Sequence, residues 1–148
     1  MEVSGEFPFR APPAVLWGAF TSREFLQKVI PGCKELKEVE PDRFQVNIEI
    51  GLAGIKGKYS GSVHITEKDV PKSYRMRVEG KGLPGWVKAE GRLELQSADP
   101  ASTKVVYAGQ FQAGGLIAGI GQRMLEGVAK LMIKQFFQAV EKEIQKDA

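Results

Sequence analysis

The sequence predicts an α+β fold in which an antiparallel meander of strands is followed by one long helix. Between residues 36 and 112, apolar and polar residues alternate in six successive segments joined by short connections, which is the pattern of strands with one buried face. From Leu116 to about Lys146, apolar residues instead recur three or four positions apart, which predicts an α-helix of about 30 residues with one apolar face. The chain has 148 residues, of which 43% are hydrophobic, so we expect one domain over residues 1–148.

The N-terminal segment is expected to form one strand and two short helices. Residues 2–9 place apolar side chains at every second position, which predicts a strand. Pro13 suits the first turn of a helix because its fixed φ matches the helical value. Either Thr21 or Ser22 can cap a second short helix, and Pro31 ends it because a proline disfavours helical backbone at the residue before it.

Six further strands complete a sheet of seven. Their connections are too short for crossovers, so we expect neighbours to run antiparallel. The predicted strands span residues 36–39, 43–50, 56–66, 73–80, 86–96 and 103–112.

Three glycines lie within the predicted terminal helix, although each interior glycine weakens a helix by about 1 kcal/mol relative to alanine. At about 100° per residue, Gly121 and Gly127 fall within the apolar stripe and Gly119 on the polar side. We therefore expect Gly121 and Gly127 to face the sheet and to leave space for a ligand. Small residues on the inner strand face either mark a sharply curved sheet or widen that space; these are Gly57, Gly61, Ala89, Gly91 and Gly109.

The two ends of the meander differ in character. One end collects the polar turns at 40–42, 68–72 and 97–102, whereas the other collects glycine-rich apolar segments. A gathering of exposed apolar residues usually marks a ligand entrance or an interaction surface, and lysines beside it suit anionic headgroups or an acidic partner. The expected mouth consists of Leu52, Ile55, Leu83, Trp86 and Leu116, flanked by Lys56, Lys58, Lys81 and Lys88.

Catalytic groups and metal ligands do not cluster in the sequence. The stretch GKGLPG matches a dinucleotide-binding pattern, but Pro84 lies within it and a predicted strand follows, where such a site needs a helix. His64 is the only histidine and is expected to face outward. The aspartates fall in predicted turns or in the tail: Asp42, Asp69, Asp99 and Asp147. We therefore expect no metal site, no catalytic set, no cofactor and no enzymatic activity.

The polar groups expected on the inner face are tyrosines. Tyr59, Tyr74 and Tyr107 are either core residues with satisfied hydroxyl groups or, for Tyr59 and Tyr107, contacts to the polar end of a ligand. Cys33 is the only cysteine, so an intrachain disulfide is impossible. We therefore expect the protein to reside in a reducing compartment.

The sequence favours a soluble cytoplasmic protein. The first ten residues, MEVSGEFPFR, lack the pattern of a signal peptide, and no apolar run approaches the roughly 20 residues of a membrane span. The net charge of +3, without a stripe of basic and aromatic residues, gives little support for nucleic-acid binding. The apolar mouth is also compatible with a protein that lies peripherally at the inner face of the membrane.

Four stretches, VIPGCKEL, GIKGKYSGSV, GKGLPGW and GGLIAGIGQRML, resemble the CoxG-like family, which takes its name from the G subunit of carbon monoxide dehydrogenase. The order of elements is similar to that of the START-like (SRPBCC, helix-grip) superfamily. The resemblance implies a curved seven-stranded sheet wrapped around the C-terminal helix, with a cavity between them. It also implies association with molybdenum-containing carbon monoxide dehydrogenases and membranes, with quinone or lipid handling. Many members carry a further tail leading to a membrane segment, whereas this sequence ends at Ala148, which favours a soluble carrier.

These observations lead to the hypothesis of a carrier that holds an isoprenoid quinone or lipid between sheet and helix. Its partners would be that molecule, a transient membrane surface and an oxidoreductase subunit. Two alternatives are an adaptor for assembly or membrane recruitment without ligand transport, and an enzyme of the cyclase or aromatase type. The expected ligand-binding residues are Ile48, Ile50, Tyr59, Val63, Met76, Val78, Val87, Ala89, Tyr107, Phe111, Ile120, Gly121, Met124 and Val128.

Overall fold

The computed structural model describes residues 1–146, so Asp147 lies outside the described part. The elements in chain order are β1 (Glu2–Phe9), α1 (Pro13–Thr21), α2 (Arg23–Val29), β2 (Cys33–Glu40), β3 (Arg43–Ile50), β4 (Gly57–Asp69), β5 (Ser73–Gly82), β6 (Gly85–Asp99), β7 (Ser102–Gly114), the short 3-10 helix η1 (Gly115–Ile120) and α3 (Gln122–Lys146).

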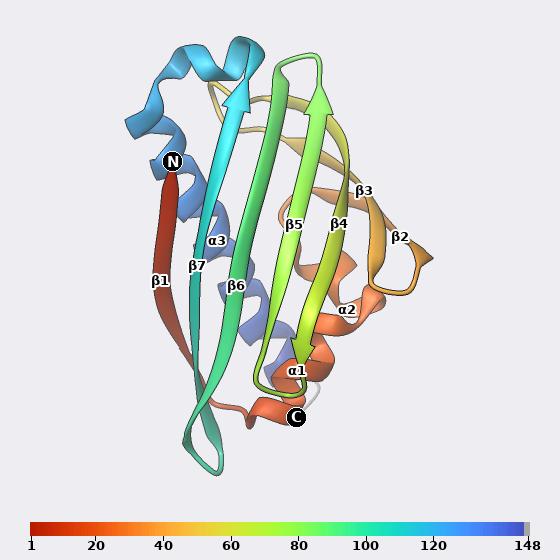
Figure 1. Cartoon of the computed structure of the whole chain (residues 1–148), viewed down its shortest axis with the longest axis vertical. Coiled ribbons are helices and arrows are strands. Elements are labelled where there is room, and N and C mark those ends of the chain that lie inside the picture. Colours follow the sequence, from red (N-terminus) through yellow and green to blue (C-terminus); the bar gives the residue numbers. More distant parts are fainter. Residues whose placement is uncertain (147–148) are drawn as a thin grey trace.

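The seven strands form one antiparallel sheet in the order β1-β7-β6-β5-β4-β3-β2. Figure 1 shows the sheet curving around α3, with α1 and α2 near its lower end. The meander is therefore as predicted, and β1 closes the far edge by pairing with β7, where Glu2 lies opposite Gln110.

The two short helices start and end where local chemistry requires it. Pro13 occupies the first turn of α1. The side-chain oxygen of Ser22 accepts a hydrogen bond from the backbone N–H of Phe25 at 3.2 Å, so Ser22 rather than Thr21 is the cap of α2. Ile30, directly before Pro31, has extended backbone and ends α2.

The terminal helix is shorter than predicted. Residues from Gly115 to Ile120 form the separate 3-10 helix η1, and α3 begins only at Gln122 and has 25 residues. Gly115 and Gly121 bracket η1 with φ values of 78° and 94°, which glycine adopts without the steric cost that other residues incur. The apolar spacing continues through η1 because residues three apart share a face of a 3-10 helix, as residues three or four apart do in an α-helix.

The expectation that Gly121 and Gly127 face the sheet is wrong. Gly121 precedes α3, and a Cβ atom at either position would find no atom within 4 Å. The buried side of α3 carries Leu125, Phe137 and Val140, and Gly127 lies on the solvent side. These glycines therefore create no space between sheet and helix.

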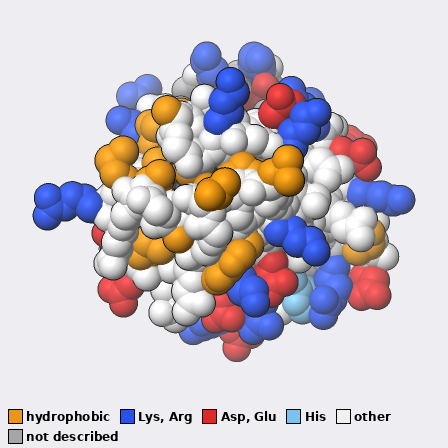
Figure 2. Space-filling model, turned by 90° about the horizontal axis from the view of Figure 1, so that it is seen from above, with side chains coloured by type: hydrophobic (Ala, Val, Ile, Leu, Met, Phe, Trp, Pro, Cys, Tyr) orange, Lys and Arg blue, Asp and Glu red, His pale blue; other side chains and the backbone are white. Residues whose placement is uncertain are grey.

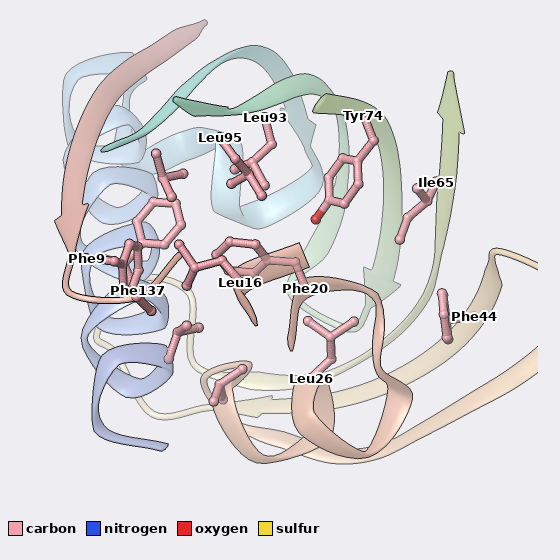
Figure 3. Packing of buried hydrophobic residues seen from close by; sticks show 14 of the residues in the cluster. Phe9, Leu16, Phe20, Leu26, Phe44, Ile65, Tyr74, Leu93, Leu95 and Phe137 are labelled. Atoms are coloured by element: carbon pink, nitrogen blue, oxygen red, sulfur yellow. The ribbon is translucent and has the colours of Figure 1, made fainter. Parts of the chain in front are cut away.

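The largest buried cluster, which we call the lower core, fills the end of the sheet where α1 and α2 lie. Figure 3 shows side chains from α1, α2 and α3 pointing toward those of the strands. Phe137 is central: its ring centroid lies 5.5 Å from Phe7, 6.0 Å from Phe9 and 6.3 Å from Phe20. This cluster anchors the C-terminal half of α3 to the sheet.

Candidate ligand-binding site

A second and smaller apolar cluster closes the opposite end of the molecule, which we call the apical end and which is uppermost in Figure 1. Ile55, Ile117 and Leu125 are buried there. They come from the loop between β3 and β4, from η1 and from the first turn of α3. We call these three residues the apical cluster.

Between the lower core and the apical cluster, the inner face of the sheet is only half-buried. Val63, Val78, Ala89 and Phe111 lie directly opposite one another on β4, β5, β6 and β7, and none of them is fully buried. Met76, two residues before Val78 on the same face, is also half-buried. In a close-packed interior such side chains would be almost completely covered, so this part of the inner face borders accessible space.

The wall of this space is lined by small residues. In the next row across the sheet, Gly61 and Gly80 are paired, and Gly80 lies opposite Val87. The close backbone contacts of α3 within the described residues are mainly with β1, α2 and η1 rather than with β4, β5 and β6. We call this half-buried part of the inner face, together with the free space at Gly80, the central hollow.

Gly61 and Gly109 allow close approach of neighbouring strands, whereas Gly80 does not serve this purpose. A Cβ at Gly61 would overlap the backbone oxygen of Glu79, and one at Gly109 would lie 2.6 Å from that of Glu90. Such approaches mark strongly coiled neighbouring strands. A Cβ at Gly80 would have no neighbour closer than the backbone oxygen of Ser60 at 3.9 Å. Gly80 therefore leaves free space on the inner face.

The structure brings most of the expected ligand-binding residues to the inner side of the sheet or to the adjoining face of η1 and α3. Those that are half-buried are Ile48, Ile50, Tyr59, Val63, Met76, Val78, Val87, Ala89, Tyr107, Phe111, Ile120 and Val128.

Two of the expected residues lie elsewhere. Gly121 is exposed at the start of α3, and 60% of Met124 is exposed. The expected apolar stripe treated residues of η1 and of α3 as one continuous α-helix. Because the two helices are separate, this stripe left out Leu125, which is buried. A stripe drawn from α3 alone would have found Leu125, because Leu125, Val128, Met132 and Phe136 recur at helical spacing.

The expected mouth residues do gather at the apical end. The backbone N–H of Ile117 donates to the backbone oxygen of Pro84 at 2.9 Å, which joins η1 to the turn that carries Leu83. However, only 6% of Ile55 and 2% of Ile117 are exposed, so the apical cluster covers this end of the inner face. The remaining members are half-buried or exposed: Leu52, Leu83, Trp86 and Leu116.

The three inner tyrosines have different surroundings. The hydroxyl group of Tyr59 donates to the backbone oxygen of Ile55 and so helps to hold the apical cluster in place. Partial burial raises the pKa of Tyr59 and of Tyr107. Tyr107 packs against Phe137, with ring centroids 5.6 Å apart. Tyr74 is completely buried in the lower core, which raises its pKa strongly.

Tyr74 is expected to make the protein sensitive to base. Since its pKa in the folded state is raised, its neutral form stabilises the fold below the ordinary value of about 10, and this stabilisation is lost as the pH rises further. Tyr74→Phe removes the ionisation, so urea unfolding from pH 8 to pH 11 should show wild type losing stability more steeply than the variant above about pH 10. Tyr107→Phe, at a half-exposed position, should change the slope less. If the free energy of unfolding fell equally with pH in wild type and in Tyr74→Phe, the result would contradict the raised pKa of Tyr74.

The described residues offer little acid, base or metal chemistry. Within residues 1–146, no group of three His, Cys, Asp or Glu side chains could hold a metal ion together. His64 lies opposite Arg43 and Arg77 in the sheet. Burial raises the pKa of the Cys33 thiol, which disfavours the reactive thiolate at neutral pH.

A family model for the G subunit of carbon monoxide dehydrogenase (CoxG) matches residues 5–145. The chain belongs to the CoxG family. Comparison with curated protein sequences yields no match. Among residues 1–146, no helix of this CoxG-family chain combines the length and apolar character needed to cross a bilayer.

Several solved structures share the fold of this CoxG-family chain. A conserved protein from Geobacillus kaustophilus is 36% identical with a TM-score of 0.96, covering 99% of this chain and 96% of its own. A START superfamily protein from Mycobacterium smegmatis is 14% identical with a TM-score of 0.81, covering 99% of each chain. The di-domain ARO/CYC BexL from the BE-7585A biosynthetic pathway is 14% identical with a TM-score of 0.73, covering 98% of this chain and 46% of its own. The helix-grip fold predicted from the sequence is confirmed.

Proposed function

We propose that this protein binds a hydrophobic small molecule, an isoprenoid quinone or a lipid, in the central hollow. The observation that carries the proposal is the half-buried apolar row Val63, Val78, Ala89 and Phe111, next to the free space at Gly80. Covering this wall with ligand would contribute about 25 cal/mol per Å² of apolar surface removed from water. Affinity would then need few polar contacts.

Membership of the CoxG family supports a role beside an oxidoreductase. We propose that the protein acts as a carrier or accessory factor of an enzyme of the molybdenum carbon monoxide dehydrogenase type and has no catalytic activity of its own. A lipophilic electron carrier fits both the hollow and such a partner, because a quinone can take electrons from an oxidoreductase and carry them to a membrane.

Uptake of a ligand requires the apical cluster to move. Ile117 lies in η1, which is bracketed by Gly115 and Gly121 in left-handed conformations. Rotation about these two glycines would withdraw Ile117 from Ile55 and Leu125 without breaking α3, at the cost of the hydrogen bond from the Ile117 N–H to the backbone oxygen of Pro84. The hollow would thereby open at the end where the exposed Leu83 and Leu116 lie.

The proposal is tested by native mass spectrometry of the protein after incubation with a naphthoquinone that carries a prenyl chain. A one-to-one adduct is expected, whereas the same ring without the chain should give none, because the chain supplies most of the apolar surface. Protein purified from its own cells should also carry a lipophilic adduct that is released on unfolding. Failure of both experiments would refute ligand binding.

An adaptor without a ligand is the second candidate, and the exposed apical side chains favour it. In that case no adduct would form, and a stoichiometric complex with an oxidoreductase subunit would shield Trp86, which is 40% exposed, from solvent quenchers of its fluorescence. An enzyme of the cyclase or aromatase type has the support of the BexL structure, which shows a similar fold only. Turnover by purified protein that is lost in Tyr59→Phe or Tyr107→Phe would favour the enzyme.

A further inference from the structure

The outer face of the sheet, which points away from α3, carries a row of polar and aromatic side chains near the apical end. Asn47, Ser60, Lys81 and Trp86 lie directly opposite one another on β3, β4, β5 and β6, and all four are exposed. We call these four residues the outer row. Because neighbouring strands lie about 4.8 Å apart, the row is about 14 Å long from Asn47 to Trp86. It can therefore contact a ligand that has two chemically different ends.

Positive charge gathers around the middle of the outer row. A shallow depression there is lined by three lysines, Lys34, Lys58 and Lys81, together with the amide and the hydroxyl group of the row. Among the ion pairs formed by residues 1–146, none includes these lysines. Glu49, opposite Lys58, is the carboxylate that lines the depression, so its net charge stays positive. Figure 2 looks onto the apical end and shows Lys and Arg side chains projecting around it. Such a set of donors suits phosphate oxygens.

Trp86 offers an aromatic surface at the end of the outer row. Its ring lies directly over Gly114, where any side chain would overlap it, and 40% of the residue remains exposed. The ammonium group of Lys88 lies 5.8 Å from the ring centre. The backbone of β7 thus supports one side of the ring, and the exposed side can stack on a planar aromatic group, as nucleic-acid bases do on aromatic side chains.

A second depression on the outer face adjoins Trp86 and is rich in hydrogen-bonding groups. Lys88, Gln110, Gln112 and Glu79 are among the residues that line it, and Gln112 lies directly opposite Lys88 on the neighbouring strand. Carboxamide groups both donate and accept hydrogen bonds. They therefore suit the polar edge of a base or the hydroxyl groups of a ribose.

We propose that the outer face of the sheet binds a nucleotide along the outer row. The base stacks on Trp86, and the phosphate groups lie between Lys34, Lys58 and Lys81. Gln112 contributes hydrogen bonds to the base or the ribose. A free phosphate has no group that stacks on the tryptophan, and a nucleoside has no group that binds the lysines. The site therefore selects a molecule that carries both.

Titration with ADP tests this proposal. Trp17 and Trp86 are the two tryptophans, and Trp17 packs against Tyr74 with ring centroids 5.6 Å apart. Trp17→Phe therefore gives a protein whose tryptophan fluorescence reports on Trp86 alone, and ADP should quench this fluorescence to saturation. Isothermal titration calorimetry of wild type should show one site. Adenosine, pyrophosphate and glycerol 3-phosphate should each bind at least about tenfold more weakly than ADP, because each makes only one of the two kinds of contact.

Variants separate the contacts to the base from those to the phosphate groups. Trp86→Leu should lower the affinity for ADP by at least about tenfold and leave the affinity for pyrophosphate unchanged. Trp86→Phe keeps an aromatic face and should lose less. Lys58→Gln with Lys81→Gln should lower the affinity for ADP and for pyrophosphate by at least about tenfold. Added salt should weaken ADP binding by wild type more than by this double variant.

A matched control removes the same charge elsewhere. Lys72 lies in the turn between β4 and β5, Lys134 lies on α3, and both are exposed; Lys72→Gln with Lys134→Gln should bind ADP as wild type does. Equal losses in the two double variants, or no response to ADP up to about 1 mM, would overturn the proposal. Equal affinities for ADP and glycerol 3-phosphate would also overturn it, since the site would then recognise a phosphate such as that of a lipid headgroup. Far-UV circular dichroism establishes that each variant folds.

The nucleotide site and the central hollow lie on opposite faces of the sheet, so the two proposals can fail separately. Gly80→Leu, which fills the hollow, should bind ADP as wild type does. Conversely, Lys58→Gln with Lys81→Gln should still form the adduct with a prenylated naphthoquinone.

Discussion

Phe137→Ala is expected to lower the free energy of unfolding by about 3–5 kcal/mol. The Phe137 side chain is 3% exposed, and its ring contacts those of Phe7, Phe9 and Phe20. Removal of the ring leaves a cavity where β1, α1 and α3 meet, and the surrounding aromatic rings cannot collapse into it without losing their own contacts. Because the free energy of unfolding of a domain is only about 5–15 kcal/mol, this single change would remove a large part of it.

Urea unfolding followed by circular dichroism measures the effect. Leu131→Ala is the matched control on the same helix, because 42% of Leu131 is exposed, and its cost should stay near about 0.5 kcal/mol. Similar losses for both variants would mean that α3 is not anchored through Phe137.

Gly80→Leu and Gly61→Leu are expected to differ in their effect on stability, although the two glycines are paired across β4 and β5. A side chain at Gly80 enters free space, whereas one at Gly61 would overlap the backbone of Glu79. Gly80→Leu should therefore fold with stability close to wild type and fill the central hollow. Gly61→Leu should be destabilised by at least about 1–3 kcal/mol, because the strands must separate.

The functional effect of Gly80→Leu should be large. Affinity for a prenylated naphthoquinone, measured by quenching of tryptophan fluorescence, should fall by at least about tenfold, because the new side chain occupies the volume of a methylene-rich ligand segment. Ala108→Leu places the same side chain on the outer face of β7 and should leave the affinity unchanged. Undiminished binding by Gly80→Leu would place the ligand outside the hollow.

The strands could be predicted closely because period-two alternation depends only on which face of the sheet is buried. The segment 43–50 forms β3 as predicted, and the inner faces of β4 to β7 were assigned correctly. The helix boundary near Gly121 could not be found in this way, because the break depends on two backbone angles rather than on hydrophobic periodicity.

The candidate site was harder to predict because the sequence does not distinguish a glycine that allows close strand contact from one that leaves open space. Gly61 and Gly109 allow close strand contact and Gly80 leaves space, but all three fit the same alternation. Ile55 looked like an exposed loop residue, and its burial results from contact with η1 and α3. Contacts between distant segments of this kind are set by the tertiary fold.

The pairing of β1 with β7 has a consequence for biosynthesis. Within the described residues 1–146, the strand at residues 2–9 pairs only with residues 103–110. A nascent chain must therefore wait until most of its length has left the ribosome before its first strand is hydrogen-bonded. Contacts so far apart in sequence slow folding, and the open edge of β7 is a template for aggregation in the meantime. Rapid production should therefore favour inclusion bodies, and slower translation or a chaperone that shields the unpaired strand should raise the yield of native protein.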